Sequence, residues 1–109
     1  MKDDIKKRLK IIIDACEAKN ADDIVDLDIT GKTVFADHFV IVSGSSPRKL
    51  DAIKDEIEDK MDKEGHFVRS IEGTIDSGWI IMDYEDIIVH IFNSDQRRFY
   101  NIERLWSDK

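Results

Sequence analysis

Three histidines and one cysteine are the imidazole and thiol groups of this chain that could bind a metal such as zinc or act as base and nucleophile. His38, His66 and His90 are scattered, no two of them form an i, i+4 pair, and Cys16 lies far from all three in sequence. A metal site needs three or four such ligands brought close together. The spacing therefore predicts neither a metal site nor a bound cofactor. Because His90 lies in an apolar stretch, we expect it to be a histidine of the core.

A second candidate for chemistry is Gly44-Ser45-Ser46, which follows an apolar stretch and precedes a helical pattern. A helix start offers free N–H groups to an anion. A Gly-Ser pair there is also typical of nucleotidyltransferases, which hold Mg²⁺ with paired carboxylates on the next strand. Here residues 67–73 carry Glu72 alone, and Asp83 and Asp86 are three apart, so they do not share a strand face. We expect a helix cap and no enzyme; the alternative is a degenerate nucleotidyltransferase that still binds a nucleotide.

The elements that must position these residues follow from the apolar periodicity. Helical spacing of apolar residues predicts a helix over 3–19. A second helix is predicted from Ser46 to about Glu64, because Ser46 and Pro47 are typical of a helix start and Gly65 of a helix end. Alternating or continuous apolar runs predict strands over 24–29, 38–43, 67–73, 79–84 and 86–92, the last two forming an antiparallel hairpin. A closing helix is expected from about residue 95. This order predicts a single α/β or α+β domain over residues 1–109, with helices packed on a mixed five-stranded sheet.

Composition narrows the function classes. The chain has 109 residues, 41% of them hydrophobic and 38% charged, with a formal net charge of −7. A net anion is a poor general binder of DNA or RNA and a better partner for something basic. A single cysteine excludes an internal disulfide framework. No apolar run reaches the length of a membrane span, and the first residues lack the apolar segment of a signal peptide. We therefore expect a soluble, cytoplasmic protein without a membrane partner.

The charge is unevenly distributed, and one acidic stretch is unusual. Residues 76–95 contain five acidic residues and no Lys or Arg, and the acids alternate with Trp79, Tyr84 and Phe92. Aromatic anchors inside a rim of one charge sign are typical of docking surfaces. For Trp79 the alternative is a place in the core. For Asp83, Glu85 and Asp86 the alternative is ordinary solvation of the hairpin turn.

Several motifs, taken in order, resemble one known family. They are DIT at 28–30, ADHFVIVSGSSPRKL at 36–50, EG at 72–73, WIIMDYEDIIVHIF at 79–92 and RRFYNIERLW at 97–106. Together they resemble the Iojap family of ribosomal silencing factors over about residues 20–107. The resemblance implies a fold related to nucleotidyltransferases without their catalytic acids. It departs mildly at His38, Phe39 and Pro47, where relatives differ.

The resemblance also implies a function. Family members bind the large ribosomal subunit through its ribosomal protein fourteen, block joining of the small subunit and repress translation; a role in large-subunit assembly is attributed to organellar relatives. The expected partner-binding residues come from the hairpin and the C-terminal segment: Trp79, Asp83, Tyr84, Glu85, Asp86, Arg97, Arg98, Tyr100, Leu105 and Trp106. Trp106 could instead pack on the sheet. Arg97 and Arg98 could pair with the hairpin acids or reach an rRNA phosphate.

A third class of function is a homodimeric adaptor. Ile88 and Phe92 are expected to be exposed apolar residues of the hairpin that could pair two copies when no ribosome is bound. Dimer and ribosome would then compete for one face, and dilution would favour ribosome binding.

Overall fold

Two helices and five strands make up the computed structural model, which describes residues 2–34, 36–74 and 76–94. The elements follow in the order α1 (Lys2–Ala18), β1 (Asp22–Asp28), β2 (His38–Gly44), α2 (Pro47–Lys63), β3 (Ser70–Thr74), β4 (Trp79–Asp83) and β5 (Ile87–Asn93). This confirms the expected order through the hairpin. The expected closing helix falls outside the described residues.

The five described strands form one mixed sheet in the order β1-β2-β5-β4-β3. Only β2 and β5 are parallel to each other, from His38 opposite Ile87 to Gly44 opposite Asn93. The other neighbours are antiparallel, including the expected β4–β5 hairpin. An α+β fold on a mixed five-stranded sheet is thus confirmed.

Helix α2 begins and ends where its sequence predicts. The Ser46 hydroxyl accepts a hydrogen bond from the Lys49 N–H at 3.2 Å, which satisfies one of the unpaired donors of the first turn. Pro47 occupies the first helical position, where a missing N–H has no cost. At the other end Gly65 adopts φ +83°, a conformation that only glycine takes without strain, and its N–H donates to the Asp62 carbonyl at 2.9 Å.

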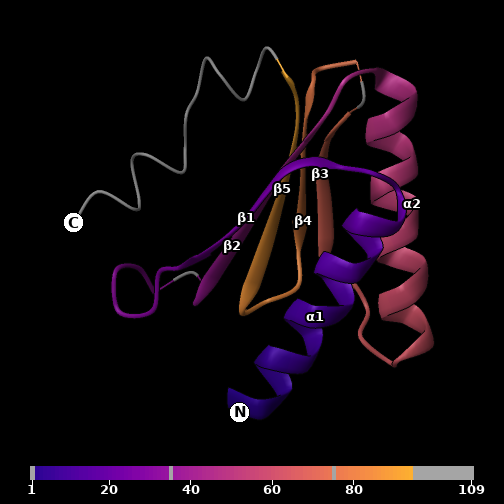
Figure 1. Cartoon of the computed structure of the whole chain (residues 1–109). Helices are drawn as coiled ribbons and strands as arrows, with labels where there is room; N and C mark the ends of the chain where they lie inside the picture. The colour runs from indigo at the N-terminus through magenta and orange to yellow at the C-terminus, as the bar shows by residue number, and fades with distance from the viewer. Residues whose placement is uncertain (1, 35, 75, 95–109) are drawn as a thin grey trace.

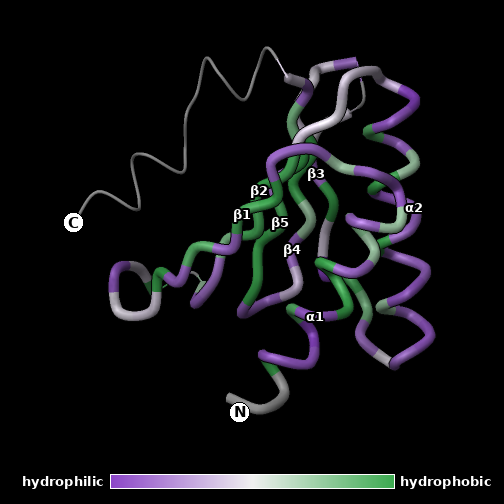
Figure 2. Tube along the Cα trace, viewed as in Figure 1, coloured by the Kyte–Doolittle hydropathy of each residue, from purple (hydrophilic) through white to green (hydrophobic). Residues whose placement is uncertain are grey.

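Both helices lie on the same side of the sheet (Figure 1), and the core fills the space between them. Figure 2 shows the apolar positions gathered in the central strands and the hydrophilic ones along the outer sides of the helices. The core residues are apolar, and they recur at helical spacing on α1 and α2 and at alternate positions on the strands. They include Leu9, Ile12, Cys16, Val40, Val42, Leu50, Ile53, Ile57, Met61, Ile80, Met82, Ile87, Val89 and Ile91.

The alternation of side chains sends the remaining strand residues to the opposite face of the sheet, which we call the far face. On β4 and β5 these are Trp79, Ile81, Asp83, Ile88, His90 and Phe92, because Trp79 pairs with Phe92, Ile81 with His90 and Asp83 with Ile88. Phe39 and Ile41 of β2 join them through their pairing with Ile88 and His90. The far face is therefore apolar and aromatic over its central strands.

Candidate functional site

Trp79 stands at the start of β4 on the far face and is half-buried. Its ring packs on Phe92 of the neighbouring strand with 4.8 Å between ring centroids, at a tilt of 31°. Its indole Nε1–H donates to His90 Nδ1 at 3.2 Å. Trp79 is thus neither a fully buried core residue nor a freely exposed one. One part of the indole is held by β5 and the rest is left accessible.

His90 is the centre of an aromatic cluster formed by Phe39, Trp79, His90 and Phe92. Phe39 meets the imidazole edge-on, with ring centroids 4.7 Å apart, and Phe92 lies nearly parallel to it at 6.1 Å. His90 is only 7% exposed, and this burial lowers its pKa from 6.5 to about 4. The imidazole is therefore neutral at pH 7, as an Nδ1 that accepts the indole hydrogen requires. The expected core histidine is confirmed, but it also contacts Trp79.

The turn between β3 and β4 fixes where Trp79 begins. The Ser77 hydroxyl donates to the Thr74 carbonyl at 2.7 Å and accepts from the Thr74 N–H at 3.2 Å, while the Ser77 N–H donates to the Thr74 hydroxyl at 3.1 Å. The Trp79 N–H also donates to the Ser77 hydroxyl, at 3.3 Å. Gly73 adopts φ +84°, and a Cβ there would overlap the carbonyl oxygen of Trp79. The backbone around the tryptophan is therefore closely specified.

The carboxylates expected at the site surround the turn at the other end of β4. Asp83 lies on the far face, four residues and about 13 Å along the strand from Trp79. Its carboxylate accepts the Glu85 N–H at 2.7 Å, and Glu85, at φ +77°, is exposed. Trp79, Asp83 and Glu85 are thus available on or beside the far face.

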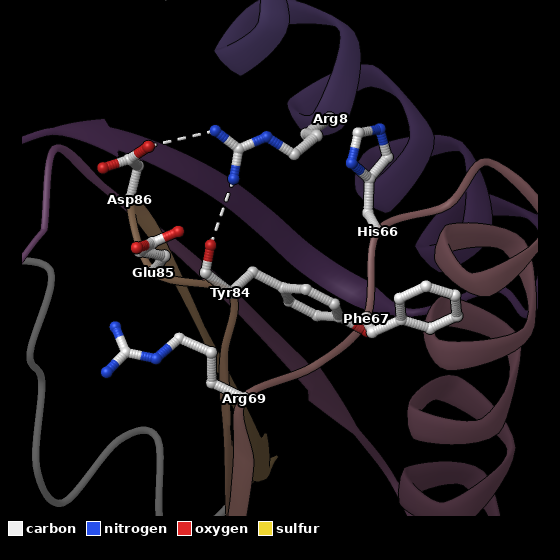
Figure 3. A pocket seen from close by; sticks show the side chains of 7 residues that line it. All are labelled: Arg8, His66, Phe67, Arg69, Tyr84, Glu85 and Asp86. Atoms are coloured by element: carbon white, nitrogen blue, oxygen red, sulfur yellow. Dashed lines mark hydrogen bonds and ion pairs between the residues drawn. The ribbon is translucent and has the colours of Figure 1, made fainter.

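Asp86 points in a different direction from Asp83. Figure 3 shows Arg8 of α1 reaching the hairpin turn, where its guanidinium donates to the Asp86 carboxylate and to the Tyr84 carbonyl, each at 3.1 Å. Arg8 is 7% exposed, whereas the Asp86 carboxylate stays about half accessible. This carboxylate is therefore drawn toward α1, and part of its charge is compensated.

The structure does not place Tyr84 on the accessible surface that the expected contact with a partner would need. Tyr84 is 3% exposed and belongs to the core between the sheet and the helices. Strand alternation explains this, since Ile80, Met82 and Tyr84 point to the helices when Trp79 and Asp83 point away. Burial and the nearby Glu58 and Asp62 carboxylates raise the pKa of the Tyr84 hydroxyl.

Phe92 is also a correction, because we expected it to be exposed for pairing two copies. It is 1% exposed and stacks against Trp79 and His90. Ile88, the other residue expected for this role, is half-buried. Five of the expected partner-binding residues lie outside the described residues, so the structure does not test them: Arg97, Arg98, Tyr100, Leu105 and Trp106.

The other residues considered for chemistry, Ser46 and the possible metal ligands, do not come together in one site within the described residues. Ser46 is the cap of α2, as expected. Within residues 2–34, 36–74 and 76–94, no three His, Cys, Asp or Glu side chains come close enough together to hold a metal ion. Burial raises the pKa of the Cys16 thiol from 9.0 to about 12, which keeps it protonated. Over the described part of the chain, neither helix has the length and hydropathy of a membrane span.

Sequence reasoning missed Arg8, although a signal was present. Arg8 falls three residues after Ile5 and four before Ile12, so helical spacing places it on the apolar side of α1. A base at such a position predicts a buried acceptor on another element. Its partners lie about 78 positions away in the chain, and no local pattern identifies them.

Comparison with known proteins decides the family. The family model described as ribosomal silencing factor during starvation matches residues 2–109. The ribosomal silencing factor RsfS of Bacillus subtilis is 42% identical over 103 residues, which cover 94% of this chain and 87% of the relative. The chain belongs to the RsfS family. The expected resemblance is confirmed, and the maize chloroplast protein Iojap also matches, with 34% identity over 64% of this chain and 30% of its own length.

Two further relatives extend the comparison of this RsfS family member. A crystal structure of a Chromobacterium violaceum protein superposes with a TM-score of 0.91 at 28% identity, covering 94% of this chain and 86% of that one. A mouse protein named mitochondrial assembly of ribosomal large subunit protein 1 is 28% identical over 91% of this chain and 45% of its own length. The fold is therefore shared with solved structures, and proteins named as chloroplastic and mitochondrial are among the relatives of this chain.

Proposed function

We propose that this chain binds the large ribosomal subunit through its ribosomal protein fourteen and thereby blocks joining of the small subunit, which represses translation. Membership of a family of ribosomal silencing factors supports a ribosomal partner. The observation that carries the docking site is Trp79, a half-buried aromatic held in place on the far face. Such anchors carry much of the binding energy of protein interfaces.

Electrostatics supports a basic protein as the surface to which the far face binds. Between residues 76 and 94 the chain has Asp76, Asp83, Glu85 and Asp86 and no Lys or Arg. Ribosomal proteins are generally basic, and opposite potentials speed association. The same charge repels rRNA phosphates, so it favours a protein contact over a nucleic-acid contact. In this proposal the protein acts by occupying space on the subunit, and it needs no catalysis and no cofactor.

The decisive test compares two aromatic truncations. Trp79→Ala should weaken binding to purified large subunits by about 30-fold, the equivalent of about 2 kcal/mol, because a central anchor is removed. Phe67→Ala is the matched control, since Phe67 is 70% exposed and lines a pocket with Arg8 and Tyr84 on the helix side of the sheet, away from Trp79 on the far face. Binding is measured by cosedimentation in sucrose gradients after both variants are shown to fold. Unchanged cosedimentation of Trp79→Ala would remove Trp79 from the site.

A charge reversal tests the electrostatic part. Glu85→Lys should mainly slow association with large subunits, and the effect should shrink as salt rises, because Glu85 is exposed and unburied charges are screened. Asp59→Lys on the exposed side of α2 adds the same charge on the other side of the sheet. Equal effects of the two variants would point to net charge and not to a docking surface.

Large-subunit assembly is the alternative function, and the name of the mouse relative favours it. The two functions differ in the particle that is bound. Silencing requires cosedimentation with mature large subunits and absence from joined ribosomes. Assembly requires cosedimentation with incomplete precursors, which should accumulate when the protein is removed.

A further inference from the structure

The contact between His90 and Trp79 has a direction that the protonation of the imidazole fixes. A tryptophan indole is only a donor, so the hydrogen bond at 3.2 Å needs a lone pair on His90 Nδ1. A neutral imidazole has one such nitrogen and carries its proton on the other. The bond therefore selects the tautomer protonated at Nε2, and this tautomer is the one that can hold the indole.

The surroundings of His90 leave the ring little freedom to turn away. Phe39 closes one edge at 4.7 Å, Phe92 lies parallel to the ring with an interplanar angle of 8°, and the side chain is 7% exposed. Ile81 of β4 and Ile41 of β2 are its register partners on either side. The neighbours of the imidazole on the described strands are apolar or aromatic, so none of these neighbours carries a charge that competes with the indole for Nδ1.

Trp79 is less enclosed than His90. It occupies the first position of β4, directly after the turn, and it is only partly buried. Its tilted contact with Phe92 supports one side of the indole, and the hydrogen bond to His90 fixes which edge points inward. An anchor that already has its bound orientation loses less conformational entropy on docking.

From this arrangement we infer that His90 is a positioning residue: its Nδ1 holds the indole of Trp79 in one orientation and so presents the anchor for docking. The inference rests on the proposed function for its docking part, whereas the orientation itself is a property of the isolated protein. His90 does not touch the partner in this view and acts only through Trp79.

Two substitutions at His90 separate the acceptor from the packing. His90→Phe keeps an aromatic ring between Phe39 and Phe92 and removes the acceptor. His90→Asn loses the ring but places an amide oxygen where Nδ1 stood, so it keeps the acceptor. If His90 has only a structural role, His90→Phe should resemble wild type more closely than His90→Asn does. If His90 positions Trp79, His90→Asn should resemble wild type more closely in every measured property of the Trp79 indole.

The first measurement uses the full chain in solution. Nitrogen-15 NMR of wild-type protein should find His90 protonated at Nε2 and not at Nδ1, and the Trp79 indole signal is identified by its loss in Trp79→Phe, which distinguishes it from Trp106. In His90→Phe the indole hydrogen should exchange with solvent about fivefold faster, the equivalent of about 1 kcal/mol, and His90→Asn should restore slow exchange. A proton on Nδ1, or unchanged exchange in His90→Phe, would overturn the inference. The wild-type measurement decides even if neither variant folds.

The second measurement uses large subunits and separates the two proposals. His90→Phe should weaken cosedimentation, His90→Asn should restore it in part, and Trp79→Ala should weaken it most. If Trp79→Ala binds like wild type, the docking proposal fails, while the NMR result still decides whether His90 orients the indole. If Trp79→Ala weakens binding and His90→Phe does not, the docking role of His90 is refuted and that of Trp79 stands.

Discussion

Gly73 offers a sharp test of the geometry that positions Trp79. Its backbone adopts φ +84°, and a Cβ at this position would overlap the carbonyl oxygen of Trp79 across the β3–β4 pair. Gly73→Ala therefore combines two costs: the strain of a left-handed conformation, about 1 kcal/mol, and the displacement of a neighbouring strand. A strand that must shift loses pairing and packing worth about 2 kcal/mol more. We expect a loss of about 3 kcal/mol in the free energy of unfolding.

The same chain supplies a control that isolates the second cost. Gly65 adopts φ +83°, nearly the same conformation, but a Cβ there would meet no atom within 4 Å. Gly65→Ala should therefore cost about 1 kcal/mol, and the loss of unfolded-state entropy on replacing glycine is common to both variants. The difference between the two variants measures the clash with the Trp79 carbonyl alone.

Urea unfolding followed by circular dichroism makes the comparison. At a slope of about 2 kcal/mol per molar, Gly73→Ala should lower the midpoint by about 1.5 M and Gly65→Ala by about 0.5 M. Equal midpoints for the two alanine variants would refute the reasoning, because they would mean that β3 accommodates a side chain at residue 73 without moving β4.

Three further predictions follow from buried groups. The pKa of His90 is lowered from 6.5 to about 4, so the unfolded state binds more protons than the folded state between these pH values. The contribution of His90 to the free energy of unfolding is fully present above pH 6.5 and falls by about 3 kcal/mol at most as the pH drops through 4. Unfolding of wild type and His90→Phe, measured over this pH range, should resolve the difference. Arg8→Met should cost about 2 kcal/mol in urea unfolding, because it leaves the Tyr84 carbonyl without this donor and Asp86 without this cation; a loss no larger than that of exposed Lys10→Met would contradict the role of Arg8. Cys16 has its pKa raised to about 12 and is fully buried, so a thiol reagent at pH 8 should modify it only as fast as the chain unfolds, and rapid modification of the native protein would show that α1 opens locally.

Periodicity in the sequence was enough to place most elements but not their neighbours. Helix α2 could be bounded in advance because Ser46, Pro47 and Gly65 each act within one turn of the helix. Strand β3 is shorter than the expected 67–73, starting at Ser70, because Phe67 lies exposed before the pairing with β4 begins. The parallel pairing of β2 with β5 joins residues about fifty positions apart, and no local pattern encodes it.

In the candidate site, too, the residue types could be predicted from the sequence but their contacts could not. Trp79 could be proposed from its type and its acidic surroundings, but its hydrogen bond to His90 depends on how β4 and β5 align. Tyr84 was grouped with Trp79 by composition, although the two-residue alternation of the strand already assigned them to opposite faces. The ion pair between Arg8 and Asp86 connects α1 to the β4–β5 hairpin, and only the folded chain reveals it.

The position of β5 at the middle of the sheet has a consequence for synthesis of the chain. Strand β5 lies between β2 and β4, yet it is the last described strand to leave the ribosome. Before residue 87 emerges, the strand pairs β1–β2 and β3–β4 have no common neighbour and remain two separate ribbons. Two-stranded ribbons are marginal in water, so we expect the sheet to form only after β5 has emerged. Prematurely terminated chains are then expected to be substrates for proteases and not partly folded domains.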